Sequence, residues 1–315
     1  MRPKILTVGR IEVEIDMTFP AFPSAGRTVK GKDLSRFPGG SGINSAIALN
    51  RICADAVLAG RVGSDPGGKR LVNFLASQKV DTRYILQDPI LPTGNYVRMT
   101  EDGPNGRVNS RGIRFEGAGG KLSAEDMDFA FKSYPMGAIV NADIPDEALL
   151  AAVFYGAKND VPLLLDATAK RETPLPVKEL KHFEIFFADG DTAARMTSVE
   201  PTSLEKSLKC CIALAGMLEA RYYVLNLAER GNFIYDGMYH RVVPAYDVED
   251  HGCVASHHYF VAAMFAKYLV SGDIKAAVEL GAVAEAAAKQ RTGSATSLPT
   301  DQELKKFIRE KTETT

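Results

Sequence analysis

Several features that restrict what a protein can do are scarce in this sequence of 315 residues. It has four cysteines, too few for a disulfide framework, and Cys210 and Cys211 are adjacent and cannot easily bridge to each other. Basic and acidic residues are balanced at 38 and 39, so the chain carries no electrostatic footprint for nucleic acid or for an anionic membrane. We therefore expect neither as a partner.

Long hydrophobic runs are also absent. The first residues, MRPKILTVGRIEVEID, contain no apolar stretch long enough for a signal peptide. The apolar segment FVAAMFAKYLV is interrupted by Lys267 and falls short of the ~20 residues that a membrane-spanning helix needs. Together with the few cysteines, this predicts a soluble cytoplasmic protein with reduced thiols.

The apolar residues that are present, 45% of the chain, are arranged as alternating strands and helices. Short apolar runs at residues 4–8 and 162–166 are typical of buried strands, and long helical patterns lie near residues 255–269 and 274–290. This alternation predicts an α/β fold with a doubly wound, mainly parallel sheet. The chain is long enough to build that fold as a single domain over residues 1–315.

Two regions break the alternation. Residues 11–36 and 92–115 alternate apolar and polar positions around turn-forming residues. We expect both to be β-ribbons inserted into the α/β body, where they form a small β-sheet lid. Such a sheet would expose edges and an apolar face, which favours pairing of two chains through the lid.

A glycine-rich turn, GGSGIN, precedes the first helical pattern. Gly39, Gly40 and Gly42 let the backbone approach a ligand closely and adopt positive φ. Asn44 ends the turn, and its amide can both donate hydrogen bonds to hydroxyl groups and accept them. Taken alone, the turn is equally compatible with a tight strand-to-helix connection.

The segments around the glycine turn favour a role in ligand binding. The segments FPSAGRTVKG, FPGGSGINSAIALNRI, AGRVGSDPGGKRL and PTGNYV occur in this order, and DIP, LLLDATAKR and TGSATSLPT follow at Asp143, Leu163 and Thr292. This series resembles the ribokinase-like carbohydrate kinases, the PfkB family. The resemblance implies a ribokinase-like α/β fold with a β-lid, a sugar as substrate and a homodimer formed through the lid. It implies ATP and Mg²⁺ as cofactors if the protein is active, and no cofactor otherwise.

The resemblance implies a sugar site that is largely kept. Glu12 and Glu14 stand where the family has an Asn and an Asp that hold sugar hydroxyls, and Asp143 replaces a longer glutamate. Carboxylates accept hydrogen bonds from hydroxyls well, although Glu12 and Glu14 could also be the exposed face of a lid strand. The expected substrate-binding residues are Glu12, Glu14, Gly39, Gly40, Ser41, Asn44 and Asp143.

The half of the site that the family uses for phosphoryl transfer is altered. Aligning the family's DTxGAGDxF motif on Phe260 puts His257 in place of the anion-hole glycine and His258 in place of the aspartate that acts as catalytic base. The family's magnesium-supporting glutamate becomes Thr192. The expected catalytic residue is His258, and the expected cofactor-binding residues are Asn226, Ala228, Gly231, Ser256 and His257.

These observations favour a family member that binds a small sugar or polyol but is catalytically impaired or inactive. Two alternatives remain open. One is an active ATP-dependent sugar kinase with His258 as the base, because a histidine of ordinary pKa can serve that role. The other is an interaction or regulatory protein that binds no ligand.

A metal site is not predicted. The residue types near the start of the helix suit zinc, but their spacing matches no closed zinc module. The residues concerned are Asp250, His251, Cys253, His257 and His258.

Overall fold

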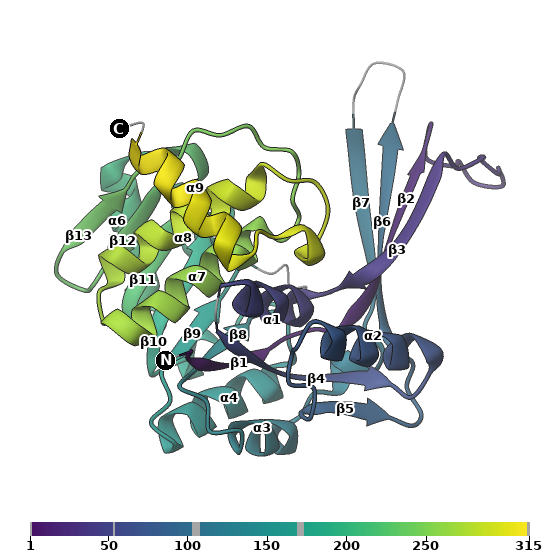
Figure 1. Cartoon of the computed structure of the whole chain (residues 1–315), viewed down its shortest axis with the longest axis horizontal. Coiled ribbons are helices and arrows are strands. Elements are labelled where there is room, and N and C mark those ends of the chain that lie inside the picture. Colours follow the sequence, from purple (N-terminus) through teal and green to yellow (C-terminus); the bar gives the residue numbers. More distant parts are fainter. Residues whose placement is uncertain (1, 53, 103–107, 169–172, 314–315) are drawn as a thin grey trace.

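The computed structural model describes residues 2–52, 54–102, 108–168 and 173–313. Within this part, nine strands form one large sheet in the order β13-β12-β11-β10-β9-β8-β1-β4-β5 (Figure 1). The strands from β5 to β11 pair in parallel, and β12 and β13 continue the sheet antiparallel. Their bounds are Lys4–Val8 (β1), Asp55–Gly63 (β4), Ile85–Asp88 (β5), Gly137–Asn141 (β8), Leu163–Asp166 (β9), Phe183–Asp189 (β10), Ala220–Asn226 (β11), Asn232–Tyr235 (β12) and His240–Val243 (β13).

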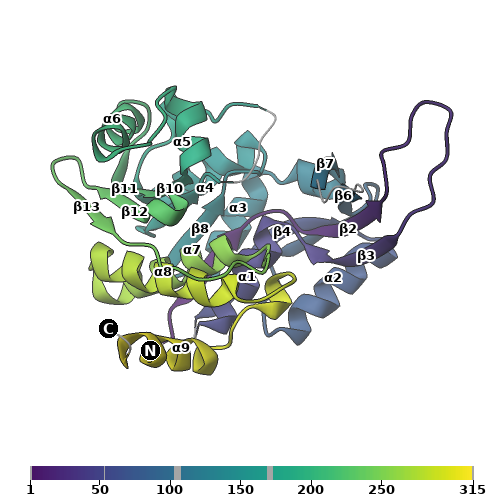
Figure 2. The same cartoon turned by 90° about the horizontal axis from the view of Figure 1, so that it is seen from above.

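Helices cover both faces of this sheet, because its central strands are apolar on both faces (Figure 2). One face packs against α1, α2, α7 and α8, with α9 outside α8, and the other packs against α3, α4, α5 and α6. Their bounds are Ser41–Arg51 (α1), Pro66–Ser77 (α2), Ala124–Phe131 (α3), Asp146–Lys158 (α4), Gly190–Thr197 (α5), Leu204–Ala215 (α6), Ser256–Ser271 (α7), Ile274–Lys289 (α8) and Asp301–Glu313 (α9). Short 3₁₀ helices lie at Gly117–Lys121, Val177–Glu179, Ala228–Arg230 and Ala295–Ser297.

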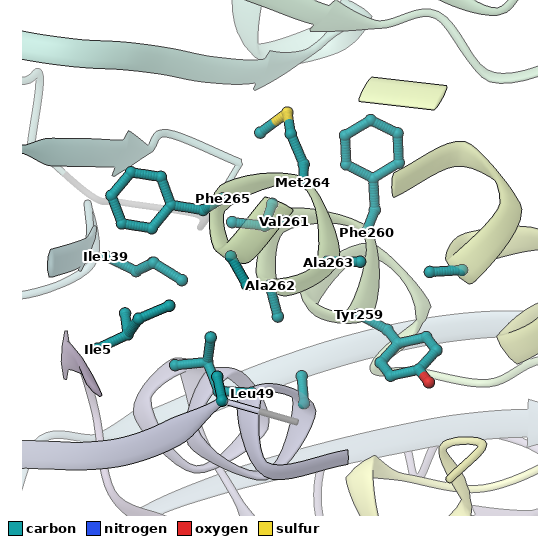
Figure 3. Close-up of a cluster of buried hydrophobic side chains, with 14 of the residues drawn as sticks. Ile5, Leu49, Ile139, Tyr259, Phe260, Val261, Ala262, Ala263, Met264 and Phe265 are labelled. Atoms are coloured by element: carbon teal, nitrogen blue, oxygen red, sulfur yellow. The ribbon is translucent and has the colours of Figure 1, made fainter. Parts of the chain in front are cut away.

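Helix α7 is the centre of the larger core cluster. It lies between α1 and α8 on one face of the sheet, and side chains such as Phe265 project toward Ile5 and Ile139 of the sheet (Figure 3). Phe260 packs its ring 5.2 Å from that of Phe187 in β10. This packing fixes the N-terminus of α7 at the edge of the sheet where the parallel strands end. The predicted α/β fold with a mainly parallel sheet is therefore confirmed.

A second, four-stranded sheet has the order β3-β2-β6-β7 and projects from the body (Figure 1). It comes from the two segments that break the sequence pattern. The strands are Glu12–Phe19 (β2), Asp33–Gly39 (β3), Gly94–Asp102 (β6) and Val108–Phe115 (β7). We call this sheet the lid. Its cross-strand register places Glu12, Glu14 and Asp16 on one face and Val13, Ile15 and Met17 on the other.

Polar residues at the carboxyl ends of the parallel strands mark where a ligand-binding site is expected. Asn141, Asp166, Asp189 and Asn226 are the last residues of β8, β9, β10 and β11. In an open parallel sheet, ligands bind outside these carboxyl ends. Among the described residues, no helix is long and apolar enough to span a membrane.

Candidate active site

The glycine turn sits where β3 meets α1 against the end of β1. Gly40 has φ 93° and ψ 156°, a conformation open almost only to glycine, and a Cβ there would lie 2.5 Å from the Arg10 carbonyl oxygen. A Cβ on Gly39 would collide with the Glu14 carboxylate. Gly40 is therefore required by the backbone of the turn, and Gly39 by the position of the Glu14 side chain, whether or not a ligand is bound.

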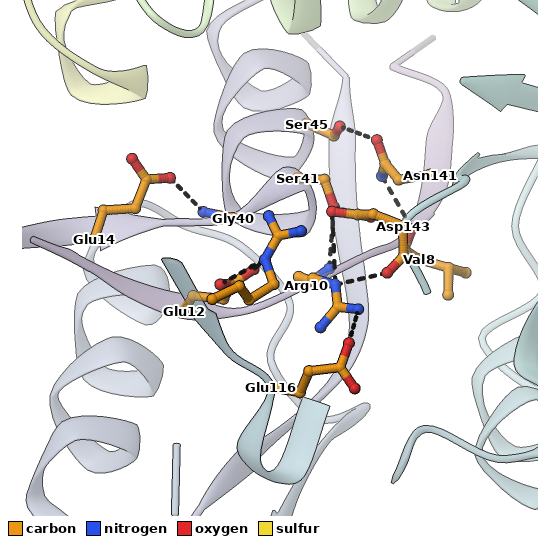
Figure 4. Close-up of polar contacts among 11 residues, drawn as sticks. Val8, Arg10, Glu12, Glu14, Gly40, Ser41, Ser45, Glu116, Asn141 and Asp143 are labelled. Carbon is orange, nitrogen blue, oxygen red and sulfur yellow. Dashed lines mark hydrogen bonds and ion pairs between the residues drawn. The ribbon is translucent and has the colours of Figure 1, made fainter. Parts of the chain in front are cut away.

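A polar network joins this turn to the end of β8 (Figure 4). Ser41 Oγ donates to Asp143 Oδ1 at 2.7 Å and accepts a hydrogen bond from the Arg10 backbone N–H at 3.1 Å. Arg10 Nε donates to the Asp143 carbonyl at 2.6 Å, and its Nη2 donates to Glu116 Oε1 at 2.6 Å. The structure thus brings together Ser41 and Asp143, two residues expected in the sugar site, and adds the buried Arg10 guanidinium beside Asp143.

Glu12 faces this network with part of its carboxylate unused. Arg114 Nε lies 3.2 Å from both carboxylate oxygens and donates its hydrogen bond to Oε2, so Oε1 is buried without a hydrogen-bond partner. Burial raises the pKa of Glu12 above its usual value, and the Arg114 charge limits the rise. An acceptor in this state can take a hydrogen bond from a sugar hydroxyl.

The Glu14 side chain already has a hydrogen-bond partner within the protein, whereas the Asn44 side chain has none in the described part of the chain. Glu14 Oε1 accepts the Gly40 backbone N–H at 2.9 Å, so this carboxylate supports the turn. The Asn44 side chain is 7% exposed and makes no hydrogen bond to another described residue. Asn44 and Glu12 therefore offer the site buried polar groups with spare hydrogen-bonding capacity, which is what a polyol needs.

At the start of α7 two histidines meet a buried carboxylate. His257 Nε2 lies 3.2 Å from Asp166 Oδ2 and 3.0 Å from Thr168 Oγ1. His258 Nδ1 lies 3.9 Å from the same Asp166 oxygen and 3.2 Å from Ser45 Oγ, and the two imidazole centroids are 3.8 Å apart. Asp166, at the end of β9, is 1% exposed. Side chains therefore fill the corner where the family's motif places a glycine and an aspartate.

The two histidines titrate in opposite directions. Burial alone lowers the pKa of His257, but the Asp166 carboxylate outweighs it, and the pKa lies above its usual value. Burial, reinforced by His257, lowers the pKa of His258 well below its usual value. Burial alone raises the pKa of Asp166, yet the two imidazoles outweigh it and lower that pKa to about 2. The Asp166 carboxylate therefore favours the charged form of His257, and burial favours the neutral form of His258.

On the expected nucleotide side, polar side chains pair with one another. Asn226 Nδ2 donates to Glu285 Oε2 at 2.9 Å, and Ala228 has positive φ (53°) where the family's turn has a glycine. The cavity beside Ala228 is about 20 Å³, room for about one water. Its lining residues are Ala228, Asn232, Ala245, Tyr246, Ala282, Glu285, Ala286 and Lys289.

The remaining expected positions have structural roles. Gly231 has φ 84°, and a Cβ there would collide with the Val243 carbonyl. Ser256 is the first residue of α7, whose N-terminus has no side-chain cap. Asp189 caps α5 by accepting the Thr192 N–H at 2.7 Å, and the Thr192 hydroxyl accepts a hydrogen bond from Arg195.

Sequence reasoning missed three residues of this region: Arg10, Arg114 and Asp166. Asp166 belongs to LLLDATAKR and directly follows an apolar run, so its place at the end of a strand could have marked it as a candidate site residue. Residues 169–171 of this segment lie outside the described part of the chain. For Arg10 and Arg114 the sequence offers no signal, because their partners lie about a hundred residues away or more.

Comparison with known proteins decides the family. The model of the pfkB family carbohydrate kinases matches residues 2–301. The chain belongs to the PfkB family of carbohydrate kinases. It is 26% identical to the ribokinase of Bacillus subtilis over 312 residues, covering 96% of this chain and 99% of that protein.

Solved structures show the same fold. A ribokinase from Arabidopsis thaliana, complexed with ribose and ATP, has a TM-score of 0.86 at 21% identity and covers 98% of this chain and 99% of that one. The ribokinase from Thermotoga maritima has a TM-score of 0.82 at 18% identity, with 98% and 99% covered. These comparisons confirm the PfkB assignment made from the motifs.

Proposed function

We propose that this PfkB-family protein binds a small sugar or polyol between the glycine turn and the lid, and that it transfers phosphate poorly or not at all. The observation that carries the proposal is the His257–Asp166 pair at the N-terminus of α7. In our alignment His257 takes the position of the family's anion-hole glycine, and the adjacent His258 takes that of the catalytic aspartate.

The sugar half of the proposal is supported by the spare hydrogen-bonding groups of Glu12 and Asn44. An unpaired buried polar group costs about 1–3 kcal/mol, and a bound hydroxyl would relieve that cost. The Arabidopsis ribokinase structure contains ribose, which makes a pentose the first candidate.

The impaired half is supported by steric and electrostatic arguments. A phosphate arriving at the start of α7 would meet the His257 imidazole instead of a glycine, with the buried Asp166 carboxylate directly behind it. Loss of one oxyanion-type donor costs ~10²–10³ in rate, and loss of a general base costs ~10²–10⁴.

His258 is a poor candidate for a substitute base. A general base works best when its pKa is near the operating pH. The pKa of His258 is lowered well below that range by burial and by its neighbour His257. This favours the impaired reading over an active kinase that uses His258.

A binding screen tests the sugar half. Wild-type protein is expected to be stabilised against heat by one or more sugars or polyols, with or without ATP and Mg²⁺. Replacing Asn44 with Ala removes the amide that we expect to hydrogen-bond to the bound hydroxyls and should weaken that binding by ~1–3 kcal/mol in calorimetry. Asn159→Ala, which changes an exposed residue at the end of α4, is the matched control and should bind as the wild type does.

Two outcomes would refute this half of the proposal. Absence of stabilisation by every sugar and polyol would favour an interaction protein without a ligand. Unchanged affinity in Asn44→Ala would place the binding site elsewhere.

We also propose that two chains pair through the lid. The face of the lid opposite Glu12 is mostly apolar and also carries the polar residues Arg36, Asn95 and Arg111. Its apolar residues are Val13, Ile15, Met17, Leu34, Pro38, Val97, Met99, Ile113 and Phe115. Leu34, Ile113 and Phe115 are 52%, 46% and 59% exposed. A second copy of this apolar surface is a partner of the right chemistry to cover it.

Sedimentation at micromolar concentration tests the pairing. The wild type is expected at about twice the chain mass of 34.1 kDa. Ile113→Lys should give monomers, because it buries a charge in the paired face. Ile90→Lys changes an exposed isoleucine outside the lid and should leave the dimer intact. A strictly monomeric wild type would rule the pairing out.

A cytoplasmic location is part of the same proposal. Cys210, Cys211 and Cys253 are free, buried thiols, which suits a reducing compartment.

A further inference from the structure

We propose that Asp166, His257 and His258 form a binding site for a divalent transition-metal ion of the zinc type. One ligand atom from each residue lies within 4.8 Å of the others. The sequence did not suggest this set, because Asp166 is 91 positions from His257. Of the residues that the sequence offered as metal ligands, the described structure brings only His257 and His258 into such a cluster.

The spacing is close to what a tetrahedral ion requires. An ion at ~2.1 Å from each ligand holds neighbouring ligand atoms ~3.4 Å apart. Asp166 Oδ2 lies 3.2 Å from His257 Nε2 and 3.9 Å from His258 Nδ1, on either side of that value. The ligand atoms of the two histidines also lie within 4.8 Å of each other, so rotation of the two rings would bring the three atoms toward this spacing.

The carboxylate is already oriented for this role. The backbone N–H and the hydroxyl of Thr168 both donate to Asp166 Oδ1, at 3.1 and 2.6 Å. They occupy one carboxylate oxygen and leave Oδ2 facing both imidazoles. Outer hydrogen bonds of this kind hold metal-ligating carboxylates in place.

The donor set selects the class of ion. Two imidazole nitrogens and one carboxylate oxygen suit Zn²⁺ and its neighbours in the first transition row, whereas Mg²⁺ prefers six oxygen ligands. Three protein ligands leave a fourth position for a water or a substrate oxygen. His257 is 32% exposed at its side chain, which gives the ion a route from solvent.

The proposed site borders the glycine turn. Ser45 Oγ lies 3.2 Å from His258 Nδ1, and Ser45 directly follows Asn44 in α1. A metal ion here would stand at the inner end of the sugar site, where its open position can receive a hydroxyl of the bound polyol.

Metal titration tests the proposal without reference to activity. Metal-free wild type is expected to bind one Zn²⁺ per chain at micromolar concentration in calorimetry. With Co²⁺ it should develop the visible d–d bands of a four-coordinate site with nitrogen ligands. Addition of Mg²⁺ in excess should leave these bands unchanged. The absence of Zn²⁺ binding, or displacement of Co²⁺ by Mg²⁺, would overturn the proposal.

Variants locate the site. His257→Gln and Asp166→Asn, each checked for retained fold by circular dichroism, should weaken Zn²⁺ binding at least tenfold. His251→Ala is the matched control, since His251 is an exposed histidine near the start of the same helix and pairs with Glu249 outside the cluster. Equal losses in His251→Ala and His257→Gln would show nonspecific binding and refute the site. Co²⁺ bands in the wild type that persist in folded His257→Gln would refute it as well.

Discussion

Replacing His257 with Gly and His258 with Asp together is expected to raise ATP-dependent sugar phosphorylation above that of the wild type. The change clears the imidazole from the start of α7, frees its backbone N–H groups and supplies a carboxylate base. The restored N–H groups and the restored base act together, so their effects on the rate do not multiply fully. We expect the phosphorylation rate to increase by about 10–10³-fold. Initial rates of ADP release with a sugar that binds the wild type give the measurement.

Full family activity is not expected from this double change. Thr192 and Ala228 still depart from the family's nucleotide side, and Asp166 still places a buried carboxylate beside the phosphate position. Asn159→Ala, remote from the site, is the control for preparation effects. A folded double variant that is slower than the wild type would show that the histidines assist transfer, against the proposal.

Gly40→Ala is expected to destabilise the protein more than any surface substitution. The new Cβ would lie 2.5 Å from the Arg10 carbonyl oxygen, and the residue would keep a φ of 93°. Strain at such a φ costs about 1–3 kcal/mol, and overpacking adds about 1–3 kcal/mol, so the free energy of unfolding should fall by about 2–6 kcal/mol. Urea unfolding gives the value.

Gly237→Ala separates the two causes of that loss. Gly237 has nearly the same φ, 91°, but a Cβ there would meet nothing within 4 Å. This variant should lose only the strain contribution, about 1–3 kcal/mol. Equal losses at the two positions would mean that the close approach of the new Cβ to the Arg10 carbonyl adds no cost.

The alternation of apolar strands and helical patterns was sufficient to predict the main sheet and helix α7. Such segments are buried on both faces or along one stripe, and burial leaves a pattern in the sequence. The β12–β13 hairpin and α9 were not predicted. Both are short or mostly exposed elements at the edge of the fold, where the pattern is weak.

The candidate site also has a part that the sequence predicts and a part that it does not. The glycine turn could be predicted, because the geometry of Gly40 allows almost no other residue. The contacts that side chains make around this turn could not be predicted. Arg10 meets Asp143 across 133 positions, and Asp166 meets His257 across 91. These pairs form because β1, β8 and β9 end, and α7 begins, at the same edge of the sheet. A single sequence does not reveal that arrangement.

The wild-type rate of phosphoryl transfer tests the central claim most directly. Purified protein would be given ATP, Mg²⁺ and, at saturation, each sugar that binds it, and ADP release would be followed. The account predicts turnover of no more than about 10⁻¹ s⁻¹, well below the ~1–10³ s⁻¹ usual for enzymes. Turnover within that usual range, abolished by His258→Ala in a folded protein, would contradict it and establish His258 as the catalytic base.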